Sequence, residues 1–149
     1  MGQVVVEKSM EISAPAQAIW EELVKVNSWP DYKPFVKKAS TVGGPLSAGS
    51  RLKMTLLMGG PAAVPLTVTI SEFVPGKRLA WTGGVKGVVS AVHSFDLEES
   101  GGKTKVTSRE EFQGALLWVM LLMVTRADLE NLHQQWVLAL KNRMENPRP

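Results

Sequence analysis

The fold of this chain is decided near its C-terminal end, where residues 116–144 read LLWVMLLMVTRADLENLHQQWVLALKNRM. The stretch opens with an unbroken apolar run, Leu116–Val124. Beyond it, apolar residues recur at helical spacing, and they are Leu129, Leu132, Trp136, Leu140 and Met144. This periodicity predicts one helix of about 25–30 residues, or ~40 Å at ~1.5 Å per residue.

The run Leu116–Val124 is apolar on every side, so something other than the core must cover part of it. The alternatives are a second subunit in a homodimer, the short helices near the N-terminus and a ligand entrance. The run is too short to cross a bilayer, and we expect no transmembrane segment. The N-terminus reads MGQVVVE and lacks the features of a signal peptide, so the expected location is cytoplasmic.

Upstream of this helix, most of the chain alternates between apolar and polar residues, as half-buried strands do. The strand candidates are 4–12, 35–42, 51–58, 66–73, 78–82, 89–97 and 104–112. Pro15 starts a short helix after the first strand, and Pro30 marks a second short helical turn. We therefore expect an α+β fold, in which a curved antiparallel sheet of about seven strands wraps around the long C-terminal helix. No repeat or linker interrupts the chain, so residues 1–149 are expected to form a single domain.

Composition excludes several classes of function. The chain has no cysteine, which excludes disulfides, thiolate metal sites and a cysteine nucleophile. Its net charge is only +3, and the basic residues are scattered except near the C-terminal end, so we expect no nucleic-acid partner. Two histidines are too few for a histidine-rich metal site, and we expect no metal. None of the glycine pairs begins a strand–loop–helix unit, so no cofactor is expected either.

Short motifs along nearly the whole chain resemble those of a known superfamily. They are Ile12-Ser13-Ala14-Pro15 followed by Ile19-Trp20, Trp29-Pro30 with Tyr32, the stretch 73–81, His93-x-Phe95-x-Leu97, and Glu110-x-Phe112-x-Gly114. Together they resemble the START-like superfamily, also called SRPBCC or the helix-grip fold, and within it the bacterial polyketide cyclase/dehydrase-type proteins. The resemblance implies a START-like ligand-binding domain with a cavity between the sheet and the C-terminal helix.

Polar residues of the hairpin 89–97/104–112 are expected to face this cavity. If Ser100-Gly101 forms the turn, His93 faces Ser108, and Glu110 lies diagonally from His93 on the same face. Such groups can orient a carbonyl or transfer a proton, or they can simply satisfy one another. A serine-hydrolase triad is excluded, because the chain lacks the G-x-S-x-G elbow.

We predict that the protein binds or carries a small hydrophobic molecule, such as a lipid, a polyketide or an aromatic compound. The expected lining residues are Met54, Leu56, Val68, Trp81, His93, Phe95, Ser108, Glu110, Trp118 and Leu122. One alternative is a cyclase/dehydratase-type enzyme, for which His93 and Glu110 are the candidate catalytic residues. The second alternative is an interaction module that assists a partner enzyme.

Overall fold

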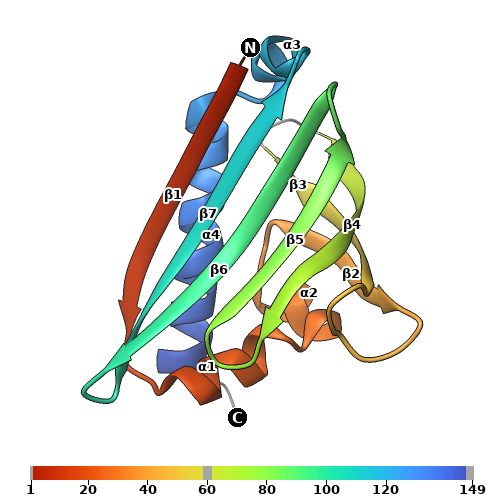
Figure 1. Ribbon diagram of the computed structural model, residues 1–149. Helices are drawn as coiled ribbons and strands as arrows, with labels where there is room; N and C mark the ends of the chain where they lie inside the picture. Colours follow the sequence, from red (N-terminus) through yellow and green to blue (C-terminus); the bar gives the residue numbers. More distant parts are fainter. Residues whose placement is uncertain (1, 59–61, 147–149) are drawn as a thin grey trace.

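The computed structural model describes residues 2–58 and 62–146, and it consists of one antiparallel sheet with helices packed against it (Figure 1). The seven strands lie in the order β1-β7-β6-β5-β4-β3-β2. Their bounds are β1 Gly2–Ile12, β2 Val36–Val42, β3 Arg51–Leu57, β4 Ala63–Val74, β5 Arg78–Val85, β6 Val89–Ser100 and β7 Lys103–Gly114. The helices are α1 Ala16–Leu23, the 3₁₀ turn η1 Val26–Ser28, α2 Trp29–Tyr32, α3 Leu117–Met123 and α4 Arg126–Glu145. The predicted α+β class is confirmed.

The core lies between α4 and the sheet, because α4 runs along one face of it (Figure 1). The buried side chains of α4 form the stripe predicted from the apolar spacing, and they include Leu129, Leu132, Trp136, Val137 and Leu140. The Trp136 ring lies at the centre of the core, with its centroid 5.2 Å from the ring of Trp29 and 5.3 Å from that of Phe95. This indole therefore links α4 to both the short helices and the sheet.

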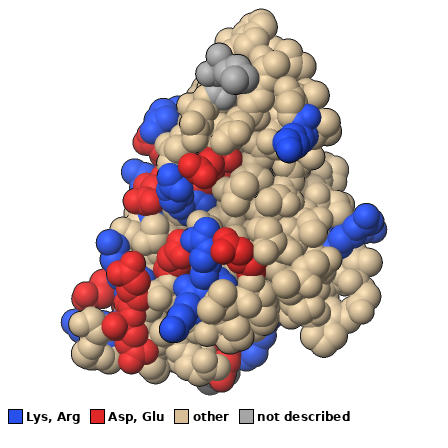
Figure 2. Space-filling model, viewed as in Figure 1, with Lys and Arg blue, Asp and Glu red and all other residues tan. Residues whose placement is uncertain are grey.

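The opposite face of the sheet carries charged side chains of both signs, which are interspersed in Figure 2. Arg78 on β5 bonds Asp96 on β6 at 2.7 Å, and Arg109 on β7 lies 3.4 Å from Glu7 on β1. Polar residues on alternate positions thus face outward while their neighbours enter the core. Among the described residues, no helix is both long enough and apolar enough to cross a membrane.

The prediction of one continuous C-terminal helix is wrong, because the structure divides it into α3 and α4. Val124 is extended, with φ −123° and ψ 103°. Thr125 then caps α4: its hydroxyl oxygen accepts from the backbone N–H of Asp128 at 3.2 Å, and its own N–H donates to the Asp128 carboxylate at 3.0 Å. This reciprocal capping box starts a new helix. The apolar pattern alone did not reveal it.

The turn predicted for the β6–β7 hairpin is also wrong. Gly101 and Gly102 form it, with φ values of 62° and 82°, which glycine adopts more readily than other residues. Every pair is consequently shifted by two residues from the expected register, so that His93 lies directly opposite Glu110, and Phe95 opposite Ser108. A shift of two leaves the same side chains on the inward face.

Candidate functional site

A cavity of about 160 Å³ lies between the sheet and α4. Met54 and Val68 form part of its wall from the sheet, Leu132 from α4 and Met120 from α3. The wall is mainly apolar, with the side chain of Glu110 among its few polar groups. Its volume is below the range of about 300–1,000 Å³ that is usual for ligand pockets, so it suits a compact molecule.

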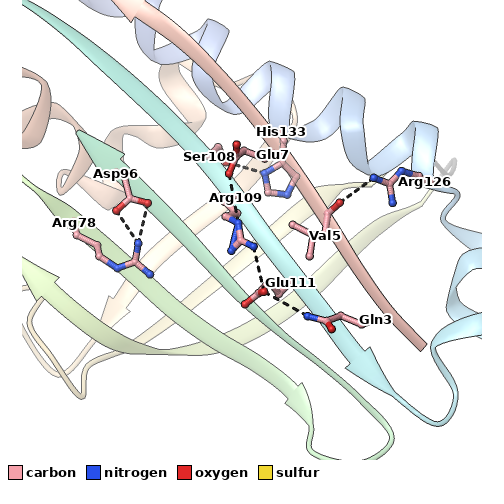
Figure 3. Close-up of polar contacts among 10 residues, drawn as sticks. All are labelled: Gln3, Val5, Glu7, Arg78, Asp96, Ser108, Arg109, Glu111, Arg126 and His133. Atoms are coloured by element: carbon pink, nitrogen blue, oxygen red, sulfur yellow. Dashed lines mark hydrogen bonds and ion pairs between the residues drawn. The ribbon is translucent and has the colours of Figure 1, made fainter. Parts of the chain in front are cut away.

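Four polar side chains form one hydrogen-bonded chain beside this cavity. His93 Nε2 lies 2.8 Å from the hydroxyl oxygen of Ser108, which lies 2.7 Å from Nδ1 of His133. His133 Nε2 in turn lies 2.8 Å from Oε1 of Glu110. Ser108 and His133 are fully buried, and Figure 3 shows their contact between β7 and α4. The chain thus joins β6, β7 and α4.

With Glu110 ionised, the bonding capacity of each group sets the direction of the protons in this chain. An ionised Glu110 accepts the N–H of His133 Nε2, which leaves Nδ1 of the same ring to accept the Ser108 hydroxyl proton. The Ser108 oxygen then accepts the N–H of His93 Nε2. Burial, together with nearby His133 and Lys33, holds the pKa of His93 well below its ordinary value, so this ring is neutral at pH 7.

The same residues include the donor types of a metal site. One ligating atom from each of His93, Glu110 and His133 lies within 4.8 Å of the others. The sequence shows that the chain has two histidines but not where they lie, and the fold brings both together. Both ring nitrogens of His133 and Nε2 of His93 already take part in the hydrogen-bonded chain. The donor types therefore suit a divalent ion, whereas in this structure the same atoms form hydrogen bonds.

The structure places six of the predicted lining residues at the cavity wall: Met54, Leu56, Val68, Trp81, His93 and Glu110. Ser108 lies one hydrogen bond behind His93. Phe95 is fully buried and stacks on the His93 ring at a centroid distance of 4.7 Å, so it supports the wall without forming it. Ligand contact by these residues remains a prediction.

The prediction that Trp118 and Leu122 line the cavity is wrong, since their side chains are 64% and 74% exposed on α3. The prediction treated 116–144 as one helix, in which Trp118 and Leu122 would share a face with the buried residues of α4. The break at Thr125 means that the faces of α3 and α4 are not aligned in this way. Leu117 is the buried residue of α3, and Met120 is its contribution to the cavity wall.

His133 is the site residue that the sequence analysis missed. It follows Leu129 by four positions and precedes Trp136 by three, so it belongs to the buried stripe of α4. A polar residue on such a stripe needs a partner. That spacing was the available signal, although it could not identify Ser108 and Glu110 as the partners.

Lys33, which follows α2, is a second buried polar residue that the sequence did not reveal. It is fully buried, and its Nζ is without a hydrogen-bond partner among the described residues. The Nζ lies 4.5 Å from the ring centroid of Trp136 and 4.8 Å from that of Tyr32. Burial lowers the pKa of Lys33 to about 7, so this amine is only partly charged at neutral pH.

Comparisons with known proteins support the resemblance found in the sequence. The model of a family described as polyketide cyclase / dehydrase and lipid transport matches residues 3–145. No curated protein matches the chain. Similar solved structures include the ZhuI aromatase/cyclase from Streptomyces sp. R1128, with TM-score 0.80, 16% identity and coverage of 97% of this chain and 94% of that one.

Two further structures show the same fold at low identity. A START superfamily protein from Mycobacterium smegmatis has TM-score 0.77 and 18% identity, with 99% of this chain and 100% of that one covered. Norcoclaurine synthase from Thalictrum flavum, in complex with dopamine and hydroxybenzaldehyde, has TM-score 0.73 and 16% identity, with 99% and 90% covered. A shared fold does not by itself give a shared activity. With its family model matched over residues 3–145, the chain belongs to the polyketide cyclase/dehydrase and lipid transport family of START-like proteins.

Proposed function

We propose that this protein binds a small hydrophobic molecule that carries a polar oxygen, in the cavity between the sheet and α4. The observation that supports this most is the pair His93 and Glu110 in a mainly apolar wall. Ser108 and His133 hold the two side chains in place from behind. An apolar wall favours the carbon skeleton of the ligand, and fixed polar groups select its orientation.

The size of the cavity and the similar proteins narrow the ligand class. At about 160 Å³, the space favours a compact cyclic or aromatic molecule over a long acyl chain. An aromatase/cyclase and a synthase in complex with hydroxybenzaldehyde are among the similar structures, and both names refer to aromatic chemistry. A compact aromatic compound with a carbonyl or hydroxyl group is therefore our first candidate.

The test begins with extraction of the purified protein and mass spectrometry of any co-purified compound. A panel of apolar and aromatic ligands is then titrated while tryptophan emission is followed. Trp81 lines the cavity and lies 4.7 Å from the His93 ring, so most of the emission change should disappear in Trp81→Phe. The proposal fails if no member of the panel binds saturably to the wild type.

His93 and Glu110 allow recognition to be separated from a purely structural role. If they contact the ligand, His93→Phe and Glu110→Gln should shift the protein's binding preference within the panel toward ligands without an oxygen. If the two side chains only complete the buried hydrogen bonds with Ser108 and His133, both variants should lose stability and keep the wild-type order of ligand affinities. Urea midpoints measured beside the titrations distinguish the two results.

A cyclase/dehydratase-type enzyme is the second candidate function. The observation that favours it is the hydrogen-bonded chain between Glu110 and His93, since proton transfer requires linked donors and acceptors. A homodimer through Leu116–Val124, a role as an interaction module and a cytoplasmic location remain predictions. Sedimentation velocity of the purified protein would test the homodimer.

A further inference from the structure

Both ends of the buried polar chain face the same cavity. His93 and Glu110 are opposite each other on β6 and β7, and both line the wall. Ser108 and His133 connect them through the fully buried interior. The four groups thus form an arc that leaves the cavity at one point of its wall and returns to it at another.

The arc has two complete hydrogen-bonding arrangements, which differ by one proton. In the first, Glu110 is ionised, and both His93 and His133 carry their proton on Nε2. In the second, a protonated Glu110 donates to His133 Nε2, His133 Nδ1–H donates to Ser108, and the Ser108 hydroxyl donates to His93 Nε2. His93 then carries its proton on Nδ1. A proton taken up at either end therefore reverses every bond between the two ends.

We propose that His93, Ser108, His133 and Glu110 form a proton relay for the bound ligand, and that the ligand class is enolisable ketones. The relay rests on the proposed ligand binding and adds a reaction to it. His93 Nδ1 removes a proton from the carbon next to the carbonyl, and the electrons of the broken C–H bond form the C=C bond of the enolate. His93 passes its Nε2 proton to Ser108, Ser108 passes its own to His133 Nδ1, and His133 passes its Nε2 proton to Glu110.

Glu110 completes the step by protonating the enolate oxygen, so the ligand leaves as its enol and the protein keeps its number of protons. Release of the Nδ1 proton from His93 and uptake of one proton at Glu110, both exchanged with water, restore the first arrangement. No oxidant, reductant or cofactor is needed. The separation also suits the reaction, because the reacting carbon and oxygen are joined through one carbonyl carbon, and a ring nitrogen of His93 lies within 4.8 Å of a carboxylate oxygen of Glu110.

The charge state of the groups agrees with this role. Burial keeps His93 neutral at pH 7, and a neutral imidazole has a lone pair that can accept a proton. Among the described residues, no hydrogen bond is formed by its Nδ1, which leaves that atom available to a ligand. Ser108 and His133 are not catalytic residues in this scheme. They are relay residues that act through His93 and Glu110.

Nuclear magnetic resonance of the histidines tests the relay without a ligand. The chain contains two histidines, so long-range ¹H–¹⁵N correlation spectra of the untagged protein report on this arc alone. We expect both rings to carry the proton on Nε2 at neutral pH. A His93 ring with its proton on Nδ1 while Glu110 is ionised would overturn the relay.

The reaction is tested with 2-tetralone as the probe, by measuring deuterium exchange next to its carbonyl in D₂O. The wild type should accelerate exchange saturably. Ser108→Ala interrupts the relay but removes no group that faces the cavity, so exchange should slow by about 10²-fold or more while the probe still binds saturably. Thr104→Ala is the matched control, because Thr104 is also fully buried on β7 but bonds the Ala14 carbonyl at 2.8 Å. It should exchange the probe as the wild type does.

The outcomes separate the two proposals. If neither 2-tetralone nor the apolar panel binds saturably, the proposed function fails, and the relay fails with it. If the probe binds without faster exchange, or if Ser108→Ala and Thr104→Ala exchange it equally fast, only the relay is overturned. Binding of hydrocarbons but not of 2-tetralone overturns the ketone class. Ser108→Thr keeps the hydroxyl and should recover at least part of the rate.

Discussion

At the scale of single residues, Lys33 places an amine inside the aromatic core. Its Nζ faces the rings of Trp29, Tyr32 and Trp136, which attract a cation, and among the described residues it has no hydrogen-bond partner. Burial lowers the pKa of Lys33 from 10.5 to about 7. Between these two pH values the unfolded chain therefore binds a proton that the folded protein does not hold.

This difference predicts how stability changes with pH. Stability rises as the pH increases from about 7 to 10.5, by about 1.4 kcal/mol per unit from this group alone. Below pH 7 the lysine is charged in both states and contributes no slope. Lys33→Met should unfold at a higher urea concentration at pH 7, and its advantage should shrink toward pH 10. Urea midpoints of wild type and variant at pH 7, 8, 9 and 10 measure this.

The matched control is Lys37→Met on the exposed surface of β2, which should follow the wild-type pH dependence. If the urea midpoints of the wild type and of Lys33→Met changed in parallel with pH, the amine would have to reach water in the folded protein. Because each variant is compared with the wild type at the same pH, other titrating groups cancel.

At the scale of elements, the junction between α3 and α4 depends on one hydroxyl. Thr125 and Asp128 satisfy two backbone N–H groups that the first turn of α4 would otherwise leave unbonded. Thr125→Ala should lower the free energy of unfolding by about 1 kcal/mol. Thr125→Ser, which keeps the accepting oxygen, should stay close to the wild type. Chemical denaturation of the wild type and the two variants measures these free energies of unfolding. An equal loss of stability in both variants would argue against the cap.

At the scale of the whole molecule, the apolar stripe of α4 joins the helix layer to the sheet. Leu140 is fully buried in this stripe, whereas Leu138 on the same helix is 39% exposed. Leu140→Ala should lower the free energy of unfolding by about 2–5 kcal/mol, since it leaves a void in the core. Leu138→Ala should cost much less. Similar denaturation midpoints for the two variants would contradict the observed orientation of α4.

Periodicity in the sequence predicted which side chains turn inward, because it is a local property of strands and helices. Alternation placed His93 and Glu110 on one face of the sheet, and that placement holds despite the wrong turn, since the shift was by two residues. The stripe of α4 was predicted in the same way, with Leu129, Trp136 and Leu140 buried as expected. The motifs also pointed to the family, which the comparison over residues 3–145 confirms.

The tertiary structure decided which of these inward residues meet. The pairing of β6 with β7 follows from two glycines at the turn, and the start of α4 follows from a capping box, neither of which alters the apolar pattern. His133 lies 23 residues beyond Glu110 in the sequence, on α4, and only the packing of α4 on the sheet brings the two side chains within 2.8 Å. Lys33 is buried for the same reason, because rings from separate elements close over it. Contacts between distant segments depend on how whole elements pack, and that information is absent from the spacing of residues within each one.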